Sequence, residues 1–288
     1  MKLTSLSEVK RVIEENHFSI RKKYGQNFLV DENILRKIVD AAQLVADSSV
    51  LEIGPGFGTL TLALAEKARQ VTTVEIDSWL IPILQNHFDG YGNIRLIHDD
   101  ALKVNWSDFF ESDEKVVVVA NLPYYITSPL IEAMLIAPFR LQKMVILVQK
   151  EVGERLVAHP EQESYGSLSV YVQSASDVEW VCSVPRGVFY PTPKVDSAVI
   201  SITPNKQKED KILSPEILEL TCRAIFGQRR KTLQNALLNS PHWKLTQEDL
   251  YLAMKELNFT TTIRGEKLYP EQIVDLANRI HLVTQSKT

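Results

Sequence analysis

The glycine-rich run Glu52-Ile53-Gly54-Pro55-Gly56-Phe57-Gly58-Thr59 has the residue types and spacing to hold a small ligand. It follows a short apolar segment and precedes a helical pattern, and glycines at such a strand-to-helix turn let the backbone approach a ligand closely. Its G-x-G-x-G spacing differs from the G-x-G-x-x-G of dinucleotide enzymes, and no P-loop lysine follows it. The pattern therefore disfavours a phosphate cradle, although a glycine turn alone can be only a tight turn.

Two acidic residues follow the next two predicted strands. Glu75 ends the second strand, 21 residues after Gly54, where a carboxylate can accept hydrogen bonds from both hydroxyls of a ribose. Asp100 follows the third strand and can accept a hydrogen bond from an adenine amino group. Either acid alone is as easily explained as solvated surface. Together with the glycine turn, however, they predict an adenosine-bearing ligand without a pyrophosphate, and S-adenosylmethionine fits best.

The run Asn121-Leu122-Pro123-Tyr124 follows the fourth predicted strand, at the edge where open α/β sheets bind their ligands. Asn and Pro also occur in ordinary turns. Beside a methyl donor, however, this run suits alkylation of a planar exocyclic amine such as adenine N6. The side-chain oxygen of Asn121 and a main-chain carbonyl, that of Leu122, would hold the amine and favour a more tetrahedral nitrogen. Tyr124 would stack on the base.

Strands and helices alternate through the first half of the chain, which predicts a parallel sheet covered on both faces. Two β-rich runs then predict an antiparallel hairpin, and a polar linker precedes three further helices. The predicted strands are 50–53, 71–76, 94–97, 116–120, 144–148, 178–184 and 195–202; the predicted helices are 31–44, 60–67, 79–88, 128–135, 150–158, 166–174, 214–238, 246–257 and 270–280.

Composition excludes several classes of protein. No apolar run approaches the length of a membrane helix, and the charged N-terminus lacks the apolar core of a secretory signal. Only two cysteines, Cys182 and Cys222, are present, so neither a disulfide framework nor a cysteine-based metal site is expected. We therefore expect a cytoplasmic protein without a metal, and a monomer is the default.

The motifs, in their order, resemble those of the bacterial small-subunit ribosomal RNA adenine N6,N6-dimethyltransferases. This resemblance covers nearly the whole chain and includes five further runs: Tyr24-Gly25-Gln26-Asn27-Phe28-Leu29, Gln149-Lys150-Glu151-Val152, Tyr165-Gly166-Ser167-Leu168-Ser169, Pro191-Thr192-Pro193-Lys194-Val195-Asp196-Ser197-Ala198 and Gln228-Arg229-Arg230-Lys231-Thr232-Leu233. It implies a class I methyltransferase that modifies two adjacent adenosines near the 3′ end of 16S ribosomal RNA in an immature 30S subunit.

The resemblance also implies roles for individual residues and regions. It implies catalysis by Asn121, Leu122, Pro123 and Tyr124, with Phe189 closing on the flipped adenine opposite Tyr124; whether Tyr125 touches the base stays open. The expected contacts with S-adenosylmethionine are Asn27, Leu29, Gly54, Gly56, Glu75, Asp100 and Asn121. The expected regions are an N-terminal basic segment (1–30), a Rossmann-like methyltransferase domain (31–204) and a helical RNA-binding domain (205–288).

Two basic clusters are candidates for RNA contact: Arg21-Lys22-Lys23, and Arg229-Arg230-Lys231 with nearby Arg223. Such short basic runs are as easily explained as solvated surface as by RNA contact. On the predicted helix, Arg229 and Arg230 would point about 100° apart, so not all of them can face one ligand. The net charge of −4 does not suggest a nucleic-acid binder, but the placement of the charges favours RNA contacts at both ends. Residues 1–30 carry 6 basic and 3 acidic groups, 31–200 carry 13 and 23, and 201–288 carry 13 and 10.

Three alternatives stay open. The first is the sibling family that methylates large-subunit (23S) ribosomal RNA in antibiotic resistance, from which Leu122, Asp196 and the run beginning at Gln228 differ. The second is an assembly factor without catalysis, which the intact motif residues disfavour. The third is a nicotinamide oxidoreductase, which the glycine spacing disfavours.

Overall fold

The computed structural model describes residues 4–21, 24–123, 126–241 and 245–285, and it divides into two compact units. The first unit is Met1–Gly153 with Glu179–Thr203, and the second is Glu154–Val178 with Pro204–Thr288. Residues 154–178, which the sequence analysis places in the methyltransferase domain, belong to the second unit in this division.

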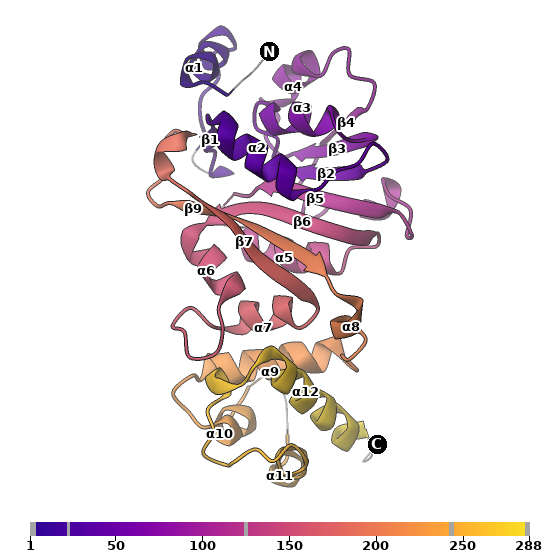
Figure 1. The fold of residues 1–288 in the computed structure, drawn as a ribbon, viewed down its shortest axis with the longest axis vertical. Coiled ribbons are helices and arrows are strands. Elements are labelled where there is room, and N and C mark those ends of the chain that lie inside the picture. Colours follow the sequence, from indigo (N-terminus) through magenta and orange to yellow (C-terminus); the bar gives the residue numbers. More distant parts are fainter. Residues whose placement is uncertain (1–3, 22–23, 124–125, 242–244, 286–288) are drawn as a thin grey trace. The chain divides into compact units, whose positions relative to one another are not determined.

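A seven-stranded sheet in the order β4-β3-β2-β5-β6-β9-β7 forms the framework of the fold (Figure 1). Strands β4, β3, β2, β5 and β6 run parallel, β9 runs antiparallel to β6, and β7 lies beside β9. This arrangement confirms the predicted mostly parallel sheet. The strands are β2 (Ser49–Ile53), β3 (Gln70–Glu75), β4 (Ile94–His98), β5 (Lys115–Asn121), β6 (Arg140–Gln149), β7 (Ser176–Val184) and β9 (Ser197–Pro204).

The helices of this region bury apolar side chains, and those of α2 pack against the sheet. Helix α2 begins after Asp31, whose carboxylate accepts a hydrogen bond from the Ile34 N–H at 2.9 Å, as an N-cap should. Its Ile38 and Val39 join alternate strand residues such as Val117 in one buried cluster. The helices are α2 (Glu32–Ala41), α3 (Thr59–Ala65), α4 (Ile81–His87), α5 (Thr127–Leu135) and α6 (Lys150–Val157), with short 3-10 turns at Trp106–Asp108 and Arg186–Val188.

The strand register brings the ends of the parallel strands to one edge. Ile53 at the end of β2 is opposite Val74 of β3 and Ala120 of β5. The residues that follow, Gly54, Glu75 and Asn121, therefore meet at this edge, as the sequence predicts.

The segment before α2 is tied to this same edge. Helix α1 (Leu6–Glu15) leads into residues 24–29, which we term the N-terminal strap. The strap ends in β1 (Phe28–Leu29), which pairs antiparallel with β8 (Phe189–Tyr190). The Phe28 ring stacks on Phe57 of the glycine turn, with ring centroids 4.2 Å apart. A buried aromatic contact thus holds the strap against the turn.

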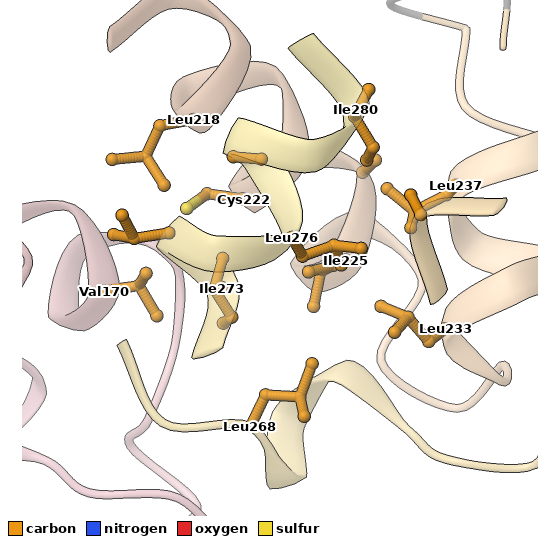
Figure 2. Packing of buried hydrophobic residues seen from close by; sticks show 14 of the residues in the cluster. Val170, Leu218, Cys222, Ile225, Leu233, Leu237, Leu268, Ile273, Leu276 and Ile280 are labelled. Atoms are coloured by element: carbon orange, nitrogen blue, oxygen red, sulfur yellow. The ribbon is translucent and has the colours of Figure 1, made fainter. Parts of the chain in front are cut away.

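The second unit is helical and has its own core, which Figure 2 shows around Cys222, Ile225 and Leu276. The fully buried Tyr165 donates a hydrogen bond from its hydroxyl to the Leu268 carbonyl at 2.8 Å, so this residue of a family motif is structural. The helices are α7 (Ser167–Gln173), α8 (Lys206–Glu209), α9 (Pro215–Gly227), α10 (Leu233–Leu238), α11 (Gln247–Glu256) and α12 (Pro270–Gln285), with a 3-10 turn at Gly265–Lys267.

The predicted single helix over 214–238 is wrong. Helix α9 ends at Gly227, and Gln228 leaves helical geometry with φ −134° and ψ 49°. Thr232 then caps α10, because its hydroxyl accepts a hydrogen bond from the Asn235 N–H. The basic residues 229–231 therefore lie in an interhelical loop, and the expected 100° spacing of their side chains does not apply.

None of the described helices has both the length and the apolarity needed to cross a membrane.

Candidate functional site

A cavity of about 280 Å³ lies at the carboxyl edge of the sheet in the first unit. The glycine turn, the ends of β2, β3 and β5, and the N-terminal strap enclose it. The structure thus brings together most of the site residues expected from the sequence: Asn27, Leu29, Gly54, Gly56, Glu75, Asp100, Asn121, Leu122 and Pro123.

The backbone of the glycine turn has a conformation that favours glycine at three positions. Gly54, Gly56 and Gly58 have φ angles of 72°, 59° and 86°, a region that strains other residues. A Cβ on Gly56 would also lie 3.0 Å from the Phe28 ring. The turn therefore needs glycine both for its conformation and for the close approach of the strap.

Two carboxylates on this wall are held by backbone N–H groups. Glu75 is 6% exposed, and its Oε1 accepts a hydrogen bond from the Asp77 N–H at 2.7 Å. Burial raises the pKa of Glu75 to about 7, although backbone hydrogen bonds act in the opposite direction. Asp100 is more open; its Oδ1 accepts a hydrogen bond from the Leu102 N–H at 3.1 Å.

Glu52 is a further wall residue, which the sequence reasoning treats only as part of the glycine run. It is 1% exposed, and its Oε2 has no hydrogen-bond partner among the described residues. Burial raises the pKa of Glu52 to about 7, and the charge of Glu75 adds to this rise. An acid within an otherwise apolar buried strand was the signal that could have identified it.

The wall of the cavity is suited to a cation that carries an adenosine. Its four carboxylates belong to Glu52, Glu75, Asp99 and Asp100, and the described lining residues include no lysine or arginine. Such a wall disfavours phosphate and favours a sulfonium or an ammonium, although Lys103, which does not line the cavity, pairs with Asp100 at 3.5 Å. Two exposed apolar side chains, Ile76 and Leu102, also line it and offer flat contact to a base. Neither side chain was predicted from the sequence, although each lies within two residues of a predicted acid.

Asn121 has a defined side-chain orientation. Its Nδ2 donates a hydrogen bond to the main-chain carbonyl of Asn27 in the strap, at 3.2 Å. Because a carbonyl only accepts, this bond fixes which end of the amide is which. No described residue donates to Oδ1, so this oxygen is available to another donor.

Hydrogen bonds hold the turn after Asn121 to β6 on one side and to the start of α5 on the other. The Leu122 N–H donates to the Leu147 carbonyl of β6 at 3.1 Å. The Pro123 carbonyl accepts from the Ile126 N–H at 3.1 Å and from the Thr127 hydroxyl at 3.4 Å. The Pro123 carbonyl thus already accepts two hydrogen bonds, whereas no described residue donates to the Leu122 carbonyl.

Two residues expected at the base are not part of the described cavity wall. Tyr124 lies outside the described residues, as does Tyr125. Phe189 is 2% exposed and belongs to the core cluster beside β1, where its backbone pairs with Leu29. Its contact with a base stays a prediction.

The basic candidates are ion-paired, exposed, or outside the described residues. Arg21 forms an ion pair with the buried Asp77 at 3.3 Å, whereas Lys22 and Lys23 lie outside the described residues. In the second unit, Arg229 pairs with Glu266 at 3.3 Å and donates to the Glu163 carbonyl at 3.0 Å. Arg223 pairs with Glu219 on α9, and Arg230 and Lys231 are exposed. Arg21 and Arg229 therefore have structural roles within their own units.

The fold is that of a class I methyltransferase. Its marks are the sheet order, the glycine turn at the edge of the sheet, and the acids Glu75 at the end of β3 and Asp100 after β4. Residues 17–281 match the family model of ribosomal RNA adenine dimethylases. The chain belongs to the ribosomal RNA adenine dimethylase family, whose methyl donor is S-adenosylmethionine.

Curated relatives cover almost the entire chain. A protein of Geobacillus sp. (strain WCH70), named ribosomal RNA small subunit methyltransferase A, is 43% identical over 95% of this chain and 96% of its own length. A protein of the same name from Bacillus cereus (strain AH187) is 41% identical over 96% of each chain.

Two solved structures are similar over most of their length. A dimethyladenosine transferase from Plasmodium falciparum has a TM-score of 0.78 and 28% identity, covering 89% of this chain and 98% of that one. The 23S rRNA methyltransferase ErmE has a TM-score of 0.67 and 29% identity, covering 88% and 100%.

Binding of S-adenosylmethionine should weaken as the pH falls. A cationic ligand favours the ionised form of Glu52 and Glu75, whose raised pKa values leave them partly protonated at neutral pH. Between about pH 8 and pH 6 we expect Kd to rise about tenfold for each such group that must ionise. Titration calorimetry in buffers of different ionisation enthalpy would record the released protons.

The control for this prediction is Glu114→Gln, which removes a half-buried carboxylate that pairs with Arg69 and does not line the cavity. This variant should keep the pH dependence, whereas Glu52→Gln and Glu75→Gln should flatten it. A Kd that is constant over the pH range in the wild-type protein would contradict the role of these carboxyls.

Proposed function

We propose that this protein transfers four methyl groups in total from S-adenosylmethionine to N6 of two neighbouring adenosines near the 3′ end of 16S ribosomal RNA. The observation that carries the proposal is the fixed amide of Asn121 on the wall of a cavity suited to a cationic adenosine. The relatives named small subunit methyltransferase A support the choice of RNA. The resemblance of the motifs supports the choice of adenosines.

Chemically, the task of the protein is to improve a poor nucleophile. The lone pair of adenine N6 is delocalised into the ring, whereas the methyl group of the donor sulfonium is already strongly electrophilic. Oδ1 of Asn121 and the carbonyl of Leu122 each accept a hydrogen bond from the amine, and these bonds favour a more tetrahedral nitrogen. The protein then contributes mainly orientation and in-line approach.

The remaining proposed roles concern the base and its proton. Tyr124 and Phe189 close on the two faces of the flipped adenine, because stacking stabilises an extruded base by about 1 to 3 kcal/mol. No general base is needed, since the methylated ammonium is acidic enough to lose its proton to water. This agrees with a turn whose groups near the amine, at Asn121 and Leu122, are neutral acceptors.

The proposed substrate is an immature 30S subunit, on which a cytoplasmic monomer acts during subunit biogenesis. Exposed basic residues in the second unit, Arg230 and Lys231, contact phosphates of the RNA. The large-subunit alternative has support from the likeness to ErmE. The small-subunit relatives, with 41% and 43% identity, favour the 16S substrate.

Mass spectrometry of the methylated RNA tests the substrate. The protein is incubated with S-adenosylmethionine and, separately, with immature small subunits, free 16S RNA and large subunits. We expect dimethyladenosine at two adjacent positions near the 3′ end of 16S RNA, with the Asn121→Ala protein as the inactive control. Product on large-subunit RNA alone would overturn the substrate, and the absence of product on all three would overturn the activity.

The salt dependence of RNA affinity tests the basic residues. Replacing both Arg230 and Lys231 with Ala should reduce the slope of log Kd against log salt by about 0.7 to 0.9 for each lost phosphate contact. Filter binding to small subunits over a salt series measures this slope. The matched variant Arg229→Ala should leave the slope unchanged and lower the stability by about 1 kcal/mol, because that side chain holds Glu266 and Glu163. An unchanged slope in the double variant would remove these residues from the interface.

A further inference from the structure

Asp77 is a fully buried acid that the proposed chemistry does not use. It follows the ribose acid Glu75 by two residues, is 0% exposed and is not among the residues that line the cavity. A buried carboxylate is stable only with hydrogen-bonded or charged partners. The partners of Asp77 therefore indicate what it holds in place.

The Trp79 N–H donates to Asp77 Oδ1 at 3.2 Å, whereas the other side-chain partners come from the segment that enters the cofactor site. Gln26 Nε2 donates to Asp77 Oδ2 at 2.8 Å, and the Arg21 guanidinium pairs with Oδ1 at 3.3 Å. Gln26 also accepts a hydrogen bond from the Arg21 N–H at 2.8 Å. The guanidinium in addition lies 5.0 Å from the centre of the Trp79 ring. Arg21, Gln26 and Asp77 thus form one closed set of contacts, which we term the latch.

The latch joins two parts of the site that the sequence separates. On one side, the Asp77 N–H holds the Glu75 carboxylate. On the other, Gln26 immediately precedes Asn27, whose carbonyl holds the Asn121 amide. Gln26, Asn27 and Leu29 of the strap also line the cavity.

We propose that Asp77 is a positioning residue that acts through the latch. By holding Gln26 and Arg21, it keeps the N-terminal strap closed over S-adenosylmethionine and keeps the Asn27 carbonyl in place for Asn121. Asp77 itself touches neither the cofactor nor the base. The inference rests on the proposed function for the identity of the reacting amine, but its first test is cofactor binding, which needs no RNA.

Two variants of opposite charge separate the latch from a simple electrostatic effect. Asp77→Asn removes a negative charge near a cationic cofactor, and Arg21→Ala removes a positive one. A field effect would weaken binding in the first variant and strengthen it in the second. The latch instead predicts weaker binding in both, by about tenfold, because each variant loses a hydrogen bond to a charged group.

Titration calorimetry with S-adenosylmethionine, well below the unfolding temperature, measures these affinities. The control is Asn93→Ala, which removes two side-chain hydrogen bonds to Ala65 and Ala68 in the same unit. It should lower the unfolding temperature but leave Kd within about twofold of wild type. Arg21→Lys, which keeps a cation for Asp77, should recover most of the lost affinity; it also supplies the test if Asp77→Asn fails to fold.

Three results would overturn the latch: wild-type affinity in Arg21→Ala, tighter binding in that variant, or an equal loss of affinity in Asn93→Ala. If one of these three results is obtained but the wild-type protein dimethylates 16S RNA, only the latch fails and the proposed function stands. If the wild-type protein does not bind S-adenosylmethionine, the proposed function fails and the latch fails with it.

The turnover number provides a second readout. At saturating cofactor, Asp77→Asn should still have a lower kcat, because the loosened strap no longer fixes the Asn121 amide. A residue needed only for stability would leave the kcat of the folded protein unchanged. An unchanged kcat would therefore overturn the link between the latch and Asn121.

Discussion

One hydrogen bond, from Asn121 Nδ2 to the carbonyl of Asn27, decides what the edge of the sheet can do. It assigns the amide's donor end to the protein and leaves the acceptor end to the substrate. It also makes the reaction depend on the N-terminal strap, which is remote in sequence from β5. The packing of Phe28 on Phe57 and the pairing of β1 with β8 hold that strap in place.

Charge as well as shape bears on which ligand the cavity can hold. Burying Glu52 and Glu75 without a cation is unfavourable, and their raised pKa values are the sign of that cost. A cationic cofactor offsets it, whereas a dinucleotide would add phosphates to a wall of carboxylates. The glycine turn favours the same conclusion, since it offers close backbone approach without a phosphate-binding lysine. Shape and charge therefore both favour an adenosyl sulfonium.

The sequence predicts the sheet and its functional edge well, because short apolar and β-branched strands, glycine turns and acids at strand ends are local signals. It fails where distant residues decide. It does not reveal the ion pair of Arg21 with Asp77 or the contacts of Arg229 with Glu266 and Glu163, and the RNA contacts of both arginines stay predictions. The helical pattern continues past Gly227, yet the Thr232 cap starts a new helix. Glu52 is recognisable in the sequence as an acid within an apolar strand, but its burial is known only from the structure.

The role of the bond between Asn121 and Asn27 is tested by the single-turnover rate of Asn121→Asp with saturating S-adenosylmethionine and 16S RNA substrate. Aspartate has nearly the same shape and still accepts a hydrogen bond from the amine, but it cannot donate one to Asn27. At saturating cofactor we predict a rate at least about 100-fold below wild type. A rate within about threefold of wild type would contradict this role, because an acceptor alone would then be sufficient.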